Sequence, residues 1–217
     1  FRGTLEQVGE GGLATRLHGG VRLGLSDPVR LDADLVLDSL SLALLHRTYP
    51  WVPLLGTVTG RARLHGPFTA LVIDAALRGP PGMLTMAGTI GGGDSVVTLV
   101  LEGGFDSLDL NAVSAAAPPS TLGGRWAVDL RVPHDTAQSF TGTVRVGLDP
   151  GIVAAVAVSG GGASVRLSAV RVDVDSARID FAGGLARGSG GLGRGGGLPS
   201  ELAFQLRADT VGYLEPL

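Results

Sequence analysis

Apolar side chains fall on every second position along much of this chain, and this pattern constrains the fold more than any other. The alternation is clear in residues 31–37, 71–77 and 202–206. Successive side chains of an extended strand point to opposite faces, whereas a helix presents one face every 3.6 residues. The pattern therefore predicts β-strands that each carry one apolar face and one mostly polar face.

Glycine and proline clusters separate these segments, for example at 65–67, 79–82 and 149–151. The chain holds 36 Gly and 12 Pro among 217 residues, yet 44% of its residues are hydrophobic, which is typical of a folded β protein with many turns rather than of a disordered chain. Short turns between strands favour antiparallel neighbours. We predict an all-β fold, an elongated antiparallel sheet.

Three other segments lack the alternation. Residues 40–45 and 112–117 each precede a proline, and we expect at most a short helical turn in these connectors. Residues 183–197 are dominated by glycine and offer few side chains that could pack. We therefore predict a flexible glycine-rich loop at 183–197.

An internal repeat is visible at a spacing of 68 residues. Asp38-Ser39-Leu40-Ser41-Leu42 recurs as Asp106-Ser107-Leu108-Asp109-Leu110. The same shift aligns four further residues with identical ones: Pro50, Leu54, Gly56 and Arg63. We therefore predict one continuous repetitive region, 1–217, with approximate units 38–105 and 106–173. The first residue is Phe1, and no signal pattern follows it, so we expect a piece of a larger protein.

Composition excludes several classes of function. The net charge is −3, only 5% of residues are aromatic, and no basic run is interleaved with aromatics, so nucleic-acid binding is not predicted. The absence of cysteine excludes disulfides and thiolate zinc sites. The four histidines are scattered without the spacing of metal ligands: His18, His46, His65 and His134.

Motifs of catalysis and cofactor binding are also missing or out of context. Residues 188–193 match GxGxxG, but a dinucleotide site needs this loop to open a helix after a strand, and more glycine follows here. The chain has no GxSxG elbow. Pairs such as Asp32/Asp34 and Asp173/Asp175 are expected on the solvated faces of strands. We predict no catalytic residue, no cofactor and no metal, and hence no enzyme.

The apolar faces allow two interpretations. They could pack against a second sheet as the core of a β-sandwich. They could instead line an open groove, because aromatic residues are scarce, alanine and glycine on these faces leave space unfilled, and a long repeat favours an elongated molecule. We favour a curled, groove-forming sheet. The candidate lining residues are Leu35, Leu37, Val58, Ala62, Leu64, Leu71, Ile73, Leu77, Val97, Leu99, Leu101, Val144, Val146, Leu148, Val165, Leu167, Leu202, Phe204 and Leu206.

One segment resembles a known family. Residues 38–45, Pro50 and the run from Gly56 through Gly60 and Gly66 to Phe68 resemble the repeating unit of the TamB/AsmA-like proteins, in which a short strand and connector lead to a glycine-spaced amphipathic strand. Residues 105–132 resemble a second, degenerate unit. The likeness extends over about half of the chain.

The resemblance implies a β-taco groove in the periplasm of a Gram-negative cell, in a protein anchored to the inner membrane by a helix outside this chain. Such a groove conducts phospholipid toward the outer membrane through contact with the acyl chains. The family also implies cooperation with an outer-membrane barrel-assembly protein. Lipid transfer in outer-membrane biogenesis is thus the expected function.

The alternative is a secreted or surface-exposed repetitive β protein, such as an adhesin or passenger stalk, that acts by surface contact. A β-solenoid of this kind would repeat every 20–30 residues or so, which a spacing of 68 does not favour. An outer-membrane barrel would carry aromatic girdles, whereas this chain has 2 Trp and 2 Tyr.

Overall fold

The computed structural model describes residues 2–8, 14–41, 56–93, 95–113, 116–133, 140–194 and 199–208. They form fourteen strands in one sheet and one short helix. In chain order these are β1 (Arg2–Val8), β2 (Ala14–Gly24), β3 (Arg30–Ser41), β4 (Thr57–Pro67), β5 (Leu71–Gly79), β6 (Gly82–Gly92), β7 (Val96–Leu108), α2 (Leu110–Val113), β8 (Ser120–Pro133), β9 (Thr141–Leu148), β10 (Gly151–Val153), β11 (Val156–Leu167), β12 (Arg171–Phe181), β13 (Gly184–Gly193) and β14 (Glu201–Ala208).

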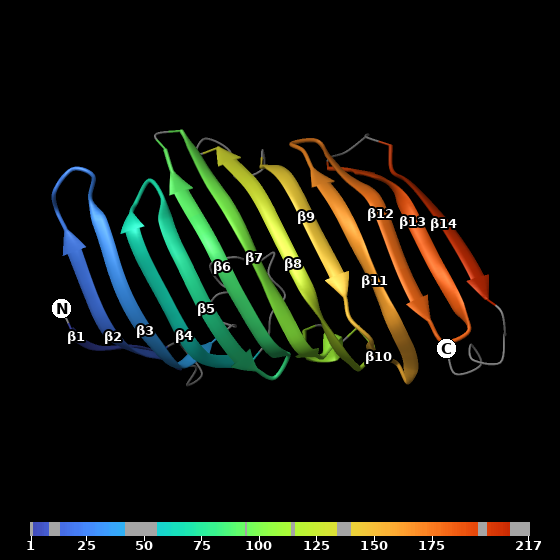
Figure 1. The fold of residues 1–217 in the computed structure, drawn as a ribbon, viewed down its shortest axis with the longest axis horizontal. Helices are drawn as coiled ribbons and strands as arrows, with labels where there is room; N and C mark the ends of the chain where they lie inside the picture. The colour runs from blue at the N-terminus through green and yellow to red at the C-terminus, as the bar shows by residue number, and fades with distance from the viewer. Residues whose placement is uncertain are drawn as a thin grey trace.

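The sheet is an antiparallel meander in which each strand pairs with the next one in the chain (Figure 1). The exception lies between β8 and β11, where β9 pairs with both strands along most of their length and the three-residue β10 pairs with both beyond it. The predicted all-β, elongated antiparallel sheet is confirmed.

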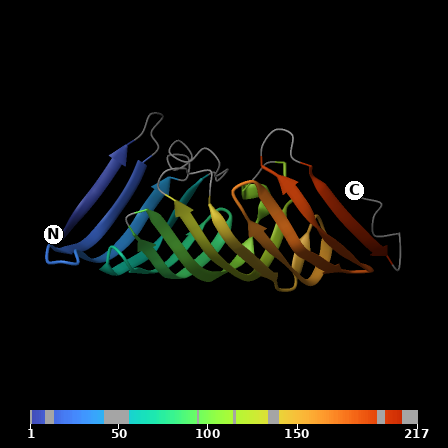
Figure 2. The ribbon, with the colours of Figure 1, turned by 90° about the horizontal axis from the view of Figure 1, so that it is seen from above.

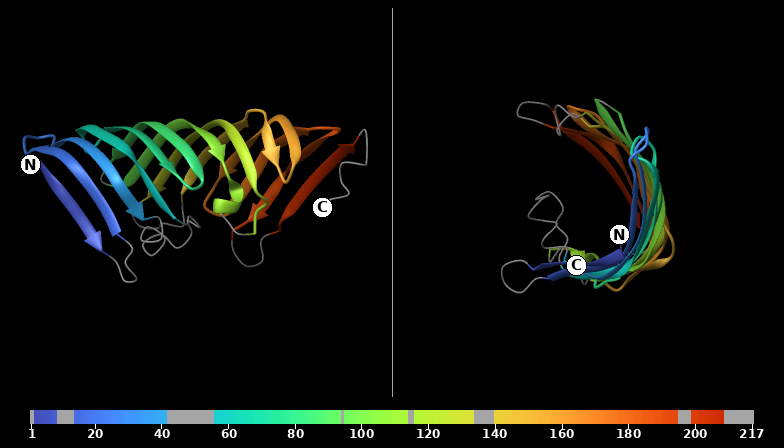
Figure 3. Two further views of the ribbon diagram at one scale, coloured as in Figure 1. Left: turned by 90° about the horizontal axis from the view of Figure 1, so that it is seen from below. Right: turned by 90° about the vertical axis from the view of Figure 1, so that its left-hand side faces the viewer.

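The sheet curls about its long axis into a trough (Figures 2 and 3). Seen from its N-terminal end, the ribbon is a crescent that is open along one side (Figure 3, right). β1 and β14 form the two ends of the trough. Within the described ranges no second sheet packs on either face, so these residues do not form a β-sandwich.

Glycines on the strands permit close approach between neighbours at the curl. Gly88 on β6 has a φ of 150°, and Gly190 on β13 has a φ of 143°, values that other residues rarely adopt. A β-carbon on Gly88 would overlap the carbonyl oxygen of Val100, and one on Gly190 would overlap that of Glu201. Glycine kinks of this kind are a known means of bending a sheet. The high glycine content therefore serves strand geometry as well as turns.

Three β-bulges occur at an Asp-Ser pair. Asp38-Ser39 on β3, Asp106-Ser107 on β7 and Asp175-Ser176 on β12 each place two residues opposite a single residue of the following strand. The bulges are 68 and 69 residues apart. A bulge bends and further twists the strand that carries it. The repeat seen in the sequence thus corresponds to a recurring bend, and the structure adds a third copy at Asp175.

The prediction of a flexible loop at 183–197 is wrong over β13. Residues Gly184–Gly193 form a full strand that pairs with β12 on one side and β14 on the other. Strand pairing uses backbone groups, which glycine supplies as well as any residue. Large neighbours cover the missing side chains, since the ring of Phe204 lies over Gly188. Residues 195–197 lie outside the described residues.

The helical connectors are resolved in part. α2 begins at Leu110 and overlaps the start of the predicted turn at 112–117. The other predicted turn, 40–45, lies mostly outside the described residues, and Leu40 and Ser41 belong to β3. None of the helices described here is both long and apolar enough to cross a bilayer.

Candidate functional site: the concave apolar face

Strand register places apolar residues of distant segments in continuous rows across the sheet. Residues that pair across two strands carry their side chains on the same face. Ala62 pairs with Ala75, and Ala75 with Met86, and this chain of pairs continues from β3 to β14. It defines the middle row: Leu35, Ala62, Ala75, Met86, Gly103, Trp126, Val146, Ala163, Ala177, Gly188 and Phe204.

Two flanking rows run beside the middle row on the same face. The first holds Ala33, Leu64, Ile73, Gly88, Leu101, Val128, Val144, Val165, Val174, Gly190 and Leu202. The second holds Leu37, Gly60, Leu77, Leu84, Phe105, Gly124, Leu148, Gly161, Ile179, Ala186 and Leu206. No member of the three rows carries a charge. We call the face that they form the inner face.

The inner face is the concave side of the trough, because two adjacent alanines on opposite faces of β5 differ in their exposure to solvent. Ala75 is only 6% exposed, whereas Ala76, the next residue on the opposite face, is exposed. Side chains converge on the concave side of a curled sheet and spread apart on its convex side. The buried apolar residues Ala33, Leu71 and Val58 share the face of Ala75.

Exposure of the inner face rises toward the ends of the trough. Leu5 on β1 is 61% exposed, and Phe204 on β14 is 76% exposed. Residues in the middle strands are half-buried by their neighbours, with no covering element among the residues described. Within the described part of the chain, the inner face is thus a long apolar surface that is only partly buried.

The convex outer face carries the charges, and many of them pair. Arg63 on β4 lies 3.6 Å from the carboxylate of Asp34 on β3. The bulge residues Asp38 and Asp175 each accept a hydrogen bond of 2.8 Å from the strand before them, from His18 Nδ1 and Arg166 respectively. These contacts are at least one-third exposed, so each contributes little stability. The alternation of the strands, rather than these pairs, places the charged residues on the outer face.

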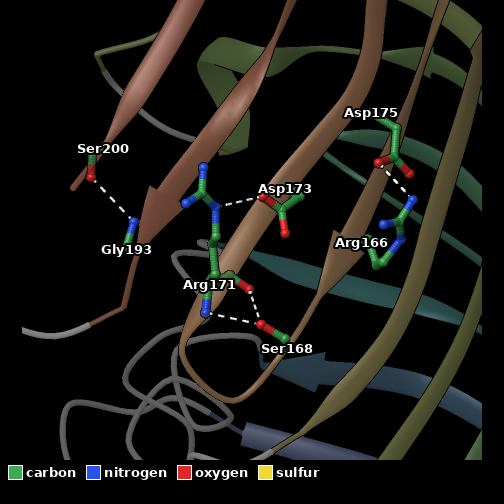
Figure 4. Close-up of polar contacts among 7 residues, drawn as sticks. All are labelled: Arg166, Ser168, Arg171, Asp173, Asp175, Gly193 and Ser200. Atoms are coloured by element: carbon green, nitrogen blue, oxygen red, sulfur yellow. Dashed lines mark hydrogen bonds and ion pairs between the residues drawn. The ribbon is translucent and has the colours of Figure 1, made fainter. Parts of the chain in front are cut away.

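Ion pairs concentrate on the outer face of β11 and β12 (Figure 4). Arg171 donates from Nε to Asp173 at 2.6 Å, and its backbone N–H donates to the Ser168 hydroxyl at 3.0 Å. Nearby, the guanidinium of Arg178 forms a bidentate pair with Asp180 and holds the pKa of that carboxyl below its usual range. Asp173 and Asp175 therefore serve as ion-pair partners. Across the part of the chain that the structure describes, no group of three or more metal-ligating side chains converges.

A shallow hollow of about 660 Å³ lies over the middle of the sheet. Its lining includes Asp74, Glu102, Arg125 and Arg145, whose positions in the ladder belong to the outer face. The lining also includes five residues of the middle row: Ala75, Met86, Gly103, Trp126 and Val146. Its mixed charges and open shape give no basis for a catalytic site.

All nineteen predicted lining residues lie in strands and share the inner face. Alternation fixed their face correctly, because a strand has a period of two residues. Residues beyond the three rows, such as Leu71 and Leu99, continue the apolar surface toward one rim through Ile90 and Leu130. Whether this face binds lipid stays a prediction.

Sequence reasoning missed much of β6, β8, β12 and β13. Met86, Phe105, Trp126 and Val174 lie on the inner face, but none was among the predicted lining residues. Glycines interrupt β6, β8 and β13 and hide the alternation, although Leu84, Met86 and Ile90 preserve it on β6. β12 contains no glycine, and its alternation is broken by the bulge between Val174 and Ala177. The residues 188–193 that match GxGxxG lie within β13, not before a helix, so they have no dinucleotide-binding geometry.

Trp126 occupies the centre of the middle row. Its indole lies on the inner face between Gly103 and Val146 in the ladder, and its Nε1 is buried with no hydrogen-bond partner among the described residues. It is the largest side chain of the row, whose other members are mostly Ala and Gly in this region.

Comparison of the chain with protein-family models, with curated proteins and with solved structures found no match.

Proposed function

We propose that this chain is a non-enzymatic lipid-transfer element that holds acyl chains against its inner face. The observation that carries the proposal is the unbroken run of uncharged rows across the strands from β3 to β14. Exposed apolar patches on soluble proteins rarely exceed a few hundred Å², and larger ones mark interaction sites. A surface that extends over the whole concave side needs an apolar occupant.

The shape of the face suits extended chains rather than a compact ligand. Strands lie about 4.8 Å apart, so fourteen of them give a trough of roughly 60 Å. One leaflet of a bilayer is about 15 Å thick in its hydrocarbon part, so the trough spans several acyl chains placed end to end. Each methylene removed from water contributes about 0.8 kcal/mol, without any preferred direction.

The composition of the rows supports movement along the trough. Ala62, Ala75 and Ala163 in the middle row leave room between the larger residues of the flanking rows. No charged side chain in the rows would hold a headgroup at one place, and the indole N–H of Trp126 in the middle row is buried. An acyl chain on this face can therefore change position without breaking specific polar contacts.

The cellular setting belongs to the same proposal and is supported by the resemblance to the TamB/AsmA-like family. The full-length protein would be anchored in the inner membrane and would pass phospholipid through the periplasm toward the outer membrane. An outer-membrane barrel-assembly protein is the partner that the resemblance suggests. The catalytic motifs sought in the sequence are missing or out of context, in keeping with a role that changes no covalent bond.

Lipid analysis of the purified chain tests the proposal. Protein secreted into the periplasm of Gram-negative cells and purified without detergent should yield phospholipid by extraction and mass spectrometry. The same protein, unfolded and refolded without lipid, should take up a fluorescent fatty acid from solution. A lipid-free preparation that also fails to bind the fatty acid would sink the proposal and leave surface contact, as in an adhesin or passenger stalk, as the function.

A further inference from the structure

Exposed apolar side chains gather along one rim of the trough, at the turns 25–29, 68–70 and 168–170. We call this edge the upper rim, because these turns lie along the top of Figure 1. Leu25 is 79% exposed, Phe68 is 50% exposed and Val170 is 58% exposed. Each of the three turns has at least one further strand of the sheet on either side, so none of them belongs to an end strand.

The lower rim, at the other ends of the strands, differs from the upper rim. The apolar residues Val58, Leu122 and Val158 lie within three residues of the lower ends of their strands, and none is more than 8% exposed. Ile152 on β10 is 52% exposed at this rim and lies next to Thr121. It provides a control position.

Two neighbouring turns of the upper rim form an apolar corner, made of Leu23, Leu25, Val29 and Phe68. All four side chains are exposed. The backbone N–H of Phe68 donates a hydrogen bond of 3.1 Å to the carbonyl oxygen of Val29, which fixes the two turns against each other. Leu23 pairs with Leu31 on the inner side of β3. The inner face therefore continues into the apolar corner without a charged residue between them.

Two arginines stand a few residues behind the tips of this corner. Arg22 and Arg30 line a hollow of about 260 Å³, together with His65 and the carboxylate of Asp32. Neither arginine forms an ion pair within the described part of the chain. Guanidinium groups bind phosphate oxygens in a fork geometry. The corner thus combines apolar tips with cations that are set back from them.

We propose that the upper rim docks on the surface of a phospholipid bilayer, with Leu25, Phe68 and Val170 at the boundary between headgroups and acyl chains. Apolar side chains at this boundary and arginines near the phosphates both stabilise interfacial binding. The docking deepens the proposed function and rests on it for its purpose, because a bilayer beside the inner face is a source of acyl chains.

Asp27 limits the depth of the docking. It is exposed in the same turn as Leu25, and a carboxylate is costly within the acyl region. The β2–β3 turn therefore stays at the boundary, where Asp27 keeps its contact with water. Asp27→Asn should strengthen binding to anionic vesicles.

Vesicle sedimentation tests the docking. The refolded, lipid-free chain should sediment with large vesicles of phosphatidylcholine and phosphatidylglycerol. Leu25→Asp, Phe68→Asp and Val170→Asp should each weaken this binding about tenfold, because a carboxylate replaces an apolar contact. Ile152→Asp, the same change at the lower rim, should stay within about twofold of wild type. All four residues are exposed, so circular dichroism should show an unchanged strand content.

The arginines are tested with the same vesicles. Arg22→Gln and Arg30→Gln should each weaken binding about fivefold, and the loss should shrink when phosphatidylglycerol is left out. The chain has no cysteine, so Leu25→Cys introduces a single thiol for an environment-sensitive dye. Its emission should shift to the blue when vesicles are added, whereas a dye at Ile152→Cys should not respond.

Fatty-acid binding separates a failure of the docking from a failure of the trough. Phe68→Asp should lose vesicle binding and keep fatty-acid binding, whereas Leu99→Asp on the inner face should do the reverse. A wild-type chain that binds the fatty acid but no vesicles overturns the docking and leaves the proposed function standing. Equal vesicle binding by Phe68→Asp and Ile152→Asp removes the upper rim as the docking surface. A dimer that Phe68→Asp dissolves, in a chain that ignores vesicles, gives the rim to a second copy instead.

Discussion

Gly88 on β6 faces the carbonyl oxygen of Val100 on β7 so closely that a β-carbon at this position would overlap that oxygen. Gly88 also lies in the first flanking row, between Ile73 and Leu101. Gly88 therefore meets two requirements of this position: it adopts a positive φ, and it has no β-carbon to overlap the Val100 carbonyl oxygen. The relationship connects a feature of composition, the abundance of glycine, to the curl that gives the sheet a concave side.

The first prediction concerns this contact. Gly88→Ala should lower the free energy of unfolding by about 2 kcal/mol, because the new methyl group must displace backbone atoms and adopt an unfavourable φ. Urea titration followed by far-UV circular dichroism measures the change.

Gly147→Ala is the matched control for Gly88→Ala. Gly147 lies on β9, and a β-carbon there would meet nothing within 4 Å. Its effect should stay within about 0.5 kcal/mol. Equal losses in the two variants would contradict the role given to Gly88.

The second prediction uses two adjacent residues on opposite faces of β7. Leu99→Asp puts a charge on the apolar surface of the inner side, between Ile90 and Leu130, and should weaken fatty-acid binding about tenfold or more. Val100→Asp makes the same change at a residue that is 54% exposed on the outer face, so binding should stay within about twofold of wild type.

Fluorescence titration with a labelled fatty acid gives both affinities, and circular dichroism shows whether each variant remains folded. A folded Leu99→Asp that binds as well as Val100→Asp would separate the inner face from lipid binding.

The third prediction concerns Trp126, which lies at the centre of the middle row. The other tryptophan of the chain, Trp51, lies outside the described residues, so Trp51→Phe leaves Trp126 as the single emitter. A fatty acid brominated along its chain should quench most of this emission on binding, because heavy atoms quench on contact. The unbrominated fatty acid is the control. Equal emission with the two ligands would place the acyl chain away from the middle row.

The face of each alternating strand could be predicted from the sequence, because a period of two assigns every residue of a strand to one side. Leu35, Ile73 and Val146 were assigned in this way, and all three lie on the inner face. The direction of the curl is a different matter. It depends on backbone contacts such as that of Gly88 with Val100, which join residues of two strands and leave no pattern within either strand.

Glycine limited the prediction most. β13 was taken for a loop because Gly184, Gly188 and Gly190 show no alternation of side chains, although their backbone pairs on both sides. The third Asp-Ser bulge was also missed, since Asp175-Ser176 is followed by Ala177 where the earlier copies have leucine. In both cases the deciding interaction comes from a neighbouring strand.

The last prediction concerns the pH dependence of the Arg178–Asp180 pair on the outer face of β12. The bidentate hydrogen bond from Arg178 lowers the pKa of Asp180 in the folded chain. A carboxyl whose folded pKa is depressed stabilises the fold above its unfolded pKa, and this contribution is lost as the pH falls through the folded pKa. Asp180→Asn should therefore lower the urea midpoint slightly at pH 7, and the difference from wild type should disappear only in strong acid. Because the pair is exposed, 0.5 M salt should also reduce the difference at pH 7. A difference that persists unchanged into strong acid would show that Asp180 acts through something other than its charge.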